Sequence, residues 1–330
     1  MKAAYIEQTG PPEKIFYADL PTPEPTGTHV LVKVGAVAVN PVDTYIRAGL
    51  IEMELPRPFI VGCDLAGTVE AVGPEVTQFA PGDRVWGSNQ GLLGRQGTFA
   101  EYACVQQHWL YPTPEEVSDR DAAAAALVGI TAHLGLFRDA KVKSGETVFV
   151  HGGSGGVGSC VVQMAKAIGA RVITTAGSPE KVQACKQLGV AMAVNYKDDD
   201  VDAAIRRFAP DGVDVWWETL REPDLERIVG HLAPGGQVII MAGREARPAL
   251  PIGPFYVKDC SIHGFAMFNA PPRQQRKCAA EINRWLAKGK LRPRIDRVMP
   301  LSETAAAHKL QEDNTLHGAG TLAGKIVLEP

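Results

Sequence analysis

The sequence has no strong excess of either charge, because 34 basic side chains stand against 37 acidic ones and leave a formal charge of −3 on 330 residues. Such a balance gives no electrostatic reason to expect nucleic acid as a partner. The chain also lacks the roughly 18 uncharged apolar residues that a transmembrane helix needs. Its longest weakly charged run, residues 122–137, contains Gly129 and His133. The sequence therefore predicts neither a nucleic-acid partner nor a membrane span.

Paired-cysteine motifs and a signal-peptide pattern are missing too. The six cysteines are scattered without C-x-x-C spacing, which favours reduced thiols over a disulfide framework. Charges at Lys2 and Glu7 interrupt the N-terminus before any apolar stretch typical of a signal peptide. These absences predict a cytoplasmic protein.

The length predicts about two domains, because domains are typically about 150 residues long. Up to about residue 120, short segments such as Val30–Val39 and Gly67–Val72 read as strands between Pro and Gly turns, which is typical of a barrel-like β unit. From there to about residue 264, strands alternate with helices, which predicts a doubly wound parallel sheet. Its predicted strands are Thr147–Val150, Arg171–Thr175, Met192–Asn195, Val213–Trp217, Gln237–Met241 and Cys260–Phe265.

The turn between the first of these strands and its helix carries the glycine fingerprint of dinucleotide-binding proteins. Gly153, Gly155 and Gly158 have the G-x-G-x-x-G spacing. One glycine permits the tight turn, one lets a diphosphate approach the backbone, and one lets helix and strand pack closely. The amides and positive dipole end of the new helix would then hold the diphosphate.

The same turn also fits a different reaction class. Gly152-x-Ser154-x-Gly156 matches the nucleophile elbow of α/β-hydrolases, and Asp214 with His263 or His308 keeps the required chain order. However, an elbow does not require Gly155 and Gly158, and no HGGG-type oxyanion motif lies upstream. The dinucleotide interpretation is therefore favoured over the hydrolase.

The residues about 20 positions beyond the last glycine indicate whether the site binds NAD or NADP. NAD sites place a carboxylate there, on the ribose 2′-hydroxyl. The second strand instead runs into Ala176-Gly177-Ser178, and Glu180 follows only one turn later. Lys181 and Tyr196 could converge on a 2′-phosphate there. The segment predicts NADPH.

Several motifs in order give the chain a family resemblance. They are Val39–Gly49, Gly62–Val69, Pro81–Val85, Gly97–Tyr102 and the His151–Gly158 loop. With them the chain resembles the zinc-independent quinone oxidoreductases of the medium-chain dehydrogenase/reductase superfamily. The resemblance implies an α/β fold, in which a GroES-like β-rich catalytic domain of residues 1–124 and 267–330 holds an inserted Rossmann domain of residues 125–266.

The resemblance also implies NADPH-dependent reduction of a quinone or an activated carbonyl compound, and a homodimer or a tetramer. Two alternatives stay open. One is an enoyl or alkenal reductase on the same scaffold. The other is a non-catalytic NADPH-binding or structural protein, of the crystallin-like or RNA-binding-like kind found among relatives.

No metal is expected. Asn40 stands where zinc-dependent relatives have a Cys, and Cys63-Asp64 stands where they have His-Glu, which falls short of the three protein ligands of a catalytic zinc. The Cys-rich loop of a structural zinc is missing between Val85 and Gly97.

Without a metal, neutral donors must meet the charge that hydride transfer leaves on the acceptor oxygen. Asn40 and Tyr45 are the predicted catalytic residues, although Tyr45 serves equally well as a wall against the nicotinamide. The cofactor-binding residues that the resemblance implies are Tyr45, Thr131, Gly153, Ser154, Gly155, Gly156, Val157, Gly177, Lys181, Tyr196, Met241, Ala242, Gly243, Arg244, Phe265, Ala266 and Met267.

Overall fold

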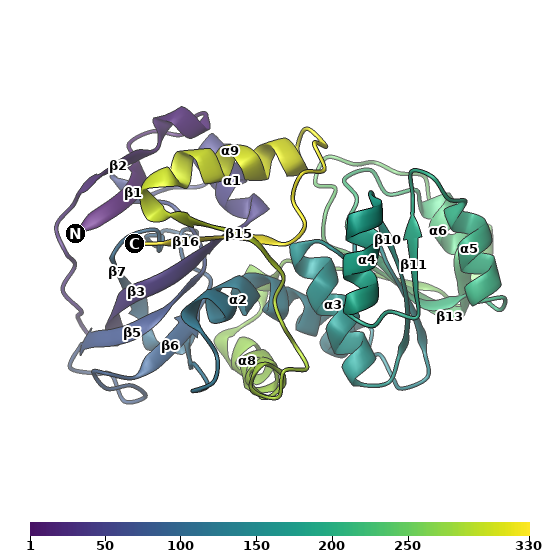
Figure 1. The fold of residues 1–330 in the computed structure, drawn as a ribbon, viewed down its shortest axis with the longest axis horizontal. Helices are drawn as coiled ribbons and strands as arrows, with labels where there is room; N and C mark the ends of the chain where they lie inside the picture. The colour runs from purple at the N-terminus through teal and green to yellow at the C-terminus, as the bar shows by residue number, and fades with distance from the viewer. The chain divides into compact units, whose positions relative to one another are not determined.

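The structure, a computed structural model, describes all residues from Met1 to Pro330 and confirms the predicted α/β fold (Figure 1). The chain forms two compact units. The β-rich unit comprises Met1–Val128 and Pro271–Pro330, and the parallel-sheet unit comprises Gly129–Ala270. None of the helices combines the length and the apolar character that a bilayer crossing requires.

The β-rich unit is built around β3 (His29–Val39), which is buried along most of its length. This strand pairs antiparallel with β5 (Leu65–Val72), β7 (Tyr102–Gln106) and β16 (Lys325–Glu329). The last strand of the chain thereby lies beside an early one, so both ends of the sequence belong to one unit. The remaining strands are β1 (Lys2–Ile6), β2 (Phe16–Asp19), β4 (Phe59–Ile60), β6 (Arg84–Gly87), β8 (Leu110–Pro112) and β15 (Ile295–Pro300).

Helices α8 (Pro272–Ala287) and α9 (Thr304–Thr315) belong to the C-terminal part of this unit. Helix α1 (Pro41–Ala48) was not predicted, although its ends are marked in the sequence. Asn40 caps it with Asp43 in a capping box, Pro41 occupies the first turn, and Gly49 ends it in the left-handed conformation. Helix α2 (Asp119–His133) contains the boundary between the units.

The parallel-sheet unit has the six predicted strands, in the order β11-β10-β9-β12-β13-β14. They are β9 (Thr147–Val150), β10 (Arg171–Ala176), β11 (Met192–Asn195), β12 (Val213–Glu218), β13 (Leu232–Ile240) and β14 (Ser261–Gly264). Helices α3 (Gly156–Ala167), α4 (Pro179–Gln187), α5 (Val201–Phe208), α6 (Leu225–His231) and α7 (Ile252–Val257) connect them. The central strands read as continuous apolar runs, because residues such as Phe149, Ile173 and Trp216 are buried in the core.

Candidate functional site

The strand order of the parallel sheet reverses beside β9. From β9 the chain runs outward through β10 and β11, and it then returns to β12 on the other side of β9. Ligands of open α/β sheets bind at such a reversal, beyond the carboxyl ends of the two strands. Most of the predicted cofactor residues follow strands at this edge: Gly153–Val157 after β9, Gly177 after β10, Tyr196 after β11, Met241–Arg244 after β13 and Phe265–Met267 after β14.

The glycine turn after β9 is packed so closely that two of its glycines have no room for a side chain. A Cβ on Gly158 would lie 2.2 Å from the Gly152 carbonyl oxygen, and a Cβ on Gly153 would lie 2.3 Å from Thr174 Oγ1. Gly152 itself has the left-handed conformation, with φ of 68°. Helix α3 starts at Gly156, so the amides of its first turn have no acceptor within the helix. The turn therefore presents unpaired donors and a positive dipole end to an anion.

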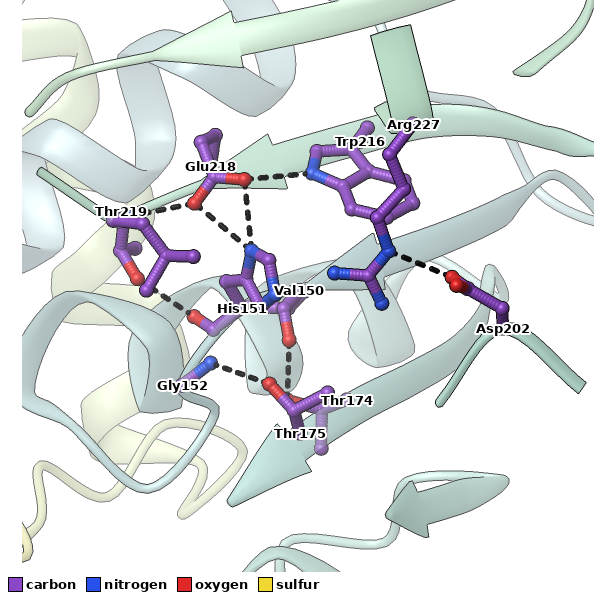
Figure 2. Close-up of polar contacts among 11 residues, drawn as sticks. Val150, His151, Gly152, Thr174, Thr175, Asp202, Trp216, Glu218, Thr219 and Arg227 are labelled. Carbon is purple, nitrogen blue, oxygen red and sulfur yellow. Dashed lines mark hydrogen bonds and ion pairs between the residues drawn. The ribbon is translucent and has the colours of Figure 1, made fainter. Parts of the chain in front are cut away.

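Two threonines of β10 fasten this turn. The Gly153 amide donates to Thr174 Oγ1 at 2.9 Å, and the Gly152 amide donates to Thr175 Oγ1 at 3.2 Å. Thr174 donates in turn to the Val150 carbonyl at 2.7 Å, as Figure 2 shows. The turn is thus held to its neighbouring strand before any ligand arrives.

The predicted ribose and 2′-phosphate residues gather at the ends of β10 and β11. The Tyr196 ring lies against Gly177, where a Cβ would meet the phenolic oxygen at 2.4 Å. Ser178 caps α4 by accepting from the Lys181 amide, which places Lys181 in the first helical turn. Tyr196 is 55% exposed, so the phenol is open to a ligand. Thr131, in contrast, is buried on α2 and does not follow a strand.

A buried carboxylate links the loops after β9 and β12 (Figure 2). Both oxygens of Glu218 lie within 2.9 Å of His151 Nδ1. The same carboxylate accepts from Trp216 Nε1 at 3.0 Å and from the Leu220 amide at 2.6 Å. Thr219 adds a hydrogen bond from Oγ1 to the His151 carbonyl at 3.1 Å. Burial opposes ionisation, yet the bonds from His151 and the other donors leave the Glu218 pKa below its usual value.

Glu218 is not among the predicted site residues. The signal that could have found it is a carboxylate directly after Val215-Trp216-Trp217 at the end of a predicted strand, since a buried charge requires partners.

Asn40, the predicted donor, lies in a buried polar cluster of the β-rich unit. Its amide nitrogen donates to Asp64 Oδ2 at 2.8 Å and to the Ala38 carbonyl at 3.1 Å. Its side-chain oxygen accepts from Lys325 Nζ, which also donates to the Val39 carbonyl at 2.7 Å. The Asn40 side chain is fully buried, and both of its amide hydrogens are directed to protein acceptors. In this arrangement Asn40 positions Asp64 and Lys325.

Two carboxyls share this cluster with one ammonium group. Lys325 Nζ lies 3.9 Å from Asp64 Oδ2, which favours the ionised form of Asp64. Asp43 accepts a hydrogen bond from the backbone amide of Asn40 at 2.7 Å but has no ion pair, and burial raises its pKa to about 7. Burial also raises the pKa of Asp64, against the effect of Lys325. Asp43 is therefore the carboxyl that holds a proton near neutrality.

The other predicted positions differ in their surroundings. Tyr45 is half-buried on α1, five residues beyond Asn40. Cys63 is buried beside Asp43, and burial raises its thiol pKa well above the usual range, so it is the neutral thiol of a packed interior. No group of three or more His, Cys, Asp or Glu side chains is arranged to hold a metal ion.

The acid and histidine residues that a hydrolase would need do not form a catalytic triad with Ser154. Asp214 accepts from the Thr147 amide at 2.7 Å, and His263 Nε2 lies 3.0 Å from Gln237 Oε1. His308 belongs to the β-rich unit, where both ring nitrogens are buried without partners. The structure therefore assembles no triad around Ser154.

Family models match both units. Residues 26–115 match the alcohol dehydrogenase GroES-like domain, and residues 156–285 match the model described as zinc-binding dehydrogenase. The quinone oxidoreductase of Pongo abelii is 35% identical over 330 residues, covering 99% of this chain and 97% of the relative.

Solved structures agree over the whole chain. One described as an NAD-dependent alcohol dehydrogenase has 32% identity and a TM-score of 0.89, with both chains fully covered. A mycobacterial protein complexed with NADPH has 29% identity and a TM-score of 0.86, again with both chains fully covered.

The buried proton on Asp43 predicts a pH-dependent stability. Because the folded pKa of about 7 exceeds the ordinary 3.8, the stabilising contribution is complete below pH 4 and is lost as pH rises through 7. Between pH 5 and pH 9 the free energy of unfolding should fall further in the wild type than in Asp43→Asn, by about 3 kcal/mol, because the two pH units between pH 5 and the folded pKa each contribute about 1.4 kcal/mol. Denaturant titrations at several pH values measure this difference. Asp211→Asn, which removes an exposed carboxyl, should keep the wild-type slope. Parallel slopes for wild type and Asp43→Asn would contradict the assignment.

Proposed function

The chain belongs to the medium-chain dehydrogenase/reductase superfamily, and on that basis we propose that it is an NADPH-dependent reductase that transfers hydride to a quinone without a metal ion. The observation that carries the proposal is the glycine turn at the β9/β12 reversal, with its unpaired amides and its carboxylate-free neighbour Ala176–Ser178. Full-length similarity to quinone oxidoreductases supports the acceptor class.

The residues at the sheet edge suit a diphosphate and a 2′-phosphate. The amides of residues 156–158 and the α3 dipole would hold the diphosphate, and the Glu218 bonds keep the neighbouring loops in place. Lys181 would supply a charge-assisted bond to the 2′-phosphate, with Tyr196 as a second donor. NADPH supplies a hydride when bound, and solvent supplies the proton that completes a two-electron reduction of the quinone.

Tyr45 is the preferred donor to the acceptor oxygen. The Asn40 amide would have to give up Asp64 or Ala38 to reach a substrate, which would leave a buried acceptor unpaired. Tyr45 is half-buried on α1, and its phenol is the other neutral donor of this segment.

Steady consumption of NADPH with a panel of quinones and short enals tests the proposal. Quinone turnover that persists in the presence of a chelator is expected. Preference for enals would favour the enone reductase, and binding of NADPH without turnover on any acceptor would favour the non-catalytic alternative.

Loss of the Lys181 charge should change cofactor preference. Lys181→Ala is expected to weaken NADPH binding by about 1–3 kcal/mol and leave NADH binding nearly unchanged, because only the 2′-phosphate contact is removed. Fluorescence titrations with both cofactors give the two dissociation constants. Lys197→Ala, at an exposed lysine next to Tyr196, is the matched control and should change neither. Equal losses for both cofactors would rule out the 2′-phosphate assignment.

Glu218 should affect both cofactors alike, as a positioning residue. In Glu218→Gln one acceptor oxygen becomes an NH₂ group, so at least one of the His151, Trp216 and Leu220 donors loses its partner. We expect NADPH and NADH to weaken by similar factors, about 5- to 30-fold for a loss of about 1–2 kcal/mol. Binding of 2′-AMP, which has no diphosphate, should stay unchanged. Glu222→Gln, at an exposed glutamate, is the control. A loss confined to 2′-AMP would contradict this role.

Removal of the Tyr45 hydroxyl tests the chemical step. If the phenol donates to the acceptor oxygen, Tyr45→Phe should lower kcat by about 5- to 30-fold, or about 1–2 kcal/mol, with little change in KM, because the bond strengthens in the transition state. Unchanged kcat in Tyr45→Phe together with weaker NADPH binding in Tyr45→Ala would make Tyr45 a wall of the cofactor site instead.

The predicted homodimer has a candidate surface at one sheet edge. Strand β14 ends the parallel sheet, and the preceding helix α7 exposes Ile252, Tyr256 and Val257 by 61%, 67% and 71%. Exposed apolar residues beside an unpaired edge strand are typical of an interface. Tyr256→Asp combined with Val257→Asp should produce a monomer in light scattering after gel filtration. Leu93→Asp, at an exposed leucine of the β-rich unit, should not. A wild-type monomer would contradict the dimer.

A further inference from the structure

A cavity of about 460 Å³ opens on the β-rich unit, between the loop of residues 88–97 and the strands around β4 and β7. This volume lies within the range of small-molecule sites. Leu20, Pro58 and Ile60 contribute apolar surface to it, and His29, Arg95 and Cys104 are among its polar residues. None of the residues predicted for the cofactor or for catalysis lines the cavity, so it is not explained by the proposed function.

The basic groups of this lining are the imidazole of His29, the N-terminal ammonium of Met1, which donates to the Leu20 carbonyl at 2.8 Å, and the guanidinium of Arg95, which has no acidic partner. Its Nε donates to the Asn89 carbonyl at 2.7 Å, and its guanidinium lies 5.5 Å from the centre of the Trp109 ring. No Asp or Glu lines the cavity, and no carboxylate pairs with Arg95. The two terminal nitrogens of the guanidinium are thus left to a ligand or to water.

The surroundings of Arg95 are cationic as well. Burial lowers the pKa of the neighbouring His108, and the charges of Arg95, Arg276 and His29 lower it further. No acidic group offsets these effects on His108. The local potential therefore favours an anion, although the whole chain has a formal charge of −3.

The loop that carries Arg95 is fixed from both sides. Gln96 accepts from the Ile60 amide at 2.8 Å and donates to the Pro58 carbonyl at 2.7 Å. The Gly97 amide donates to the Ile60 carbonyl at 2.9 Å, and the Gly91 amide donates to the Gln96 carbonyl at the same distance. A cation held on such a loop loses little conformational entropy when it pairs with a ligand.

We propose that this cavity binds a small organic monoanion with an apolar body, a short-chain carboxylate, whose carboxylate pairs with Arg95 while its chain lies on Leu20, Pro58 and Ile60. A planar guanidinium suits a carboxylate because two parallel N–H···O bonds can form. The apolar residues supply the burial that an inorganic anion could not use. The site is independent of the redox proposal, and binding can be measured without cofactor or quinone.

Calorimetric titration with hexanoate tests the assignment, with hexan-1-ol and hexylammonium as neutral and cationic probes of the same chain length and acetate as an anion with almost no chain. Hexanoate should bind more tightly than the other three. Arg95→Met should weaken hexanoate by about 10- to 100-fold, the range for one charge-assisted pair, and Arg95→Lys should recover part of the loss. Arg276→Met removes an exposed positive charge outside the cavity and should change hexanoate binding little.

Protection of a cysteine from alkylation tests whether hexanoate binds in this cavity. Cys104 lines the cavity and is half-buried, whereas Cys260 is half-buried in the other unit. Hexanoate should slow alkylation of Cys104, followed by mass spectrometry, and leave Cys260 unchanged. This also shows whether the Arg95 variants keep their fold, since Cys104 should react at the wild-type rate without ligand. Equal binding of hexanol and hexanoate, equal losses in Arg95→Met and Arg276→Met, or no protection of Cys104 would each overturn the proposal.

Discussion

The parallel-sheet unit depends on one close backbone contact, between the first turn of α3 and the turn after β9. A Cβ at Gly158 would come within 2.2 Å of the Gly152 carbonyl oxygen, so only glycine allows the helix to start so near the strand end. This contact determines where the free amides of α3 point. The bonds from the turn to Thr174 and Thr175 then hold it against β10, and Glu218 holds the other side against β12. The backbone donors of the turn are thereby held from β10 on one side and from β12 on the other.

The β-rich unit differs, because its polar cluster is buried inside the unit. Lys325 stands 285 residues after Asn40 and yet donates to it, which joins the last strand to the end of β3. Replacement of one partner in such a cluster leaves a buried polar group without its hydrogen bond, which costs free energy. This cost favours the pairing of β16 with β3 over other pairings more than it stabilises the fold. The cluster contains two carboxyls and one ammonium group, so a proton on Asp43 brings it to neutrality.

Much of the architecture could be predicted from the sequence, because strand periodicity and glycine spacing are local signals. The six parallel strands and the turn at Gly153–Gly158 are of this kind. Helix α1 was not predicted, although its start and stop signals lie within the motif Val39–Gly49. The partners of Asn40 could not be predicted at all, since Asp64 and Lys325 reach it only through antiparallel pairing of distant strands. The surroundings of Arg95 could not be predicted either, because the residues that line its cavity come from distant parts of the sequence.

The two units differ in how well binding residues can be predicted from the sequence, and the cofactor site is easier to predict than the acceptor site. Backbone amides and a few strand-end side chains recognise a diphosphate, and their positions follow from the order of the sheet. A quinone offers two carbonyl oxygens and an apolar ring, so its recognition depends on side chains in loops, whose positions no periodicity determines. Asn40 illustrates the consequence. Its place in the sequence suggested a substrate donor, but its side-chain amide donates to Asp64, which reaches it only through the antiparallel pairing of β3 with β5.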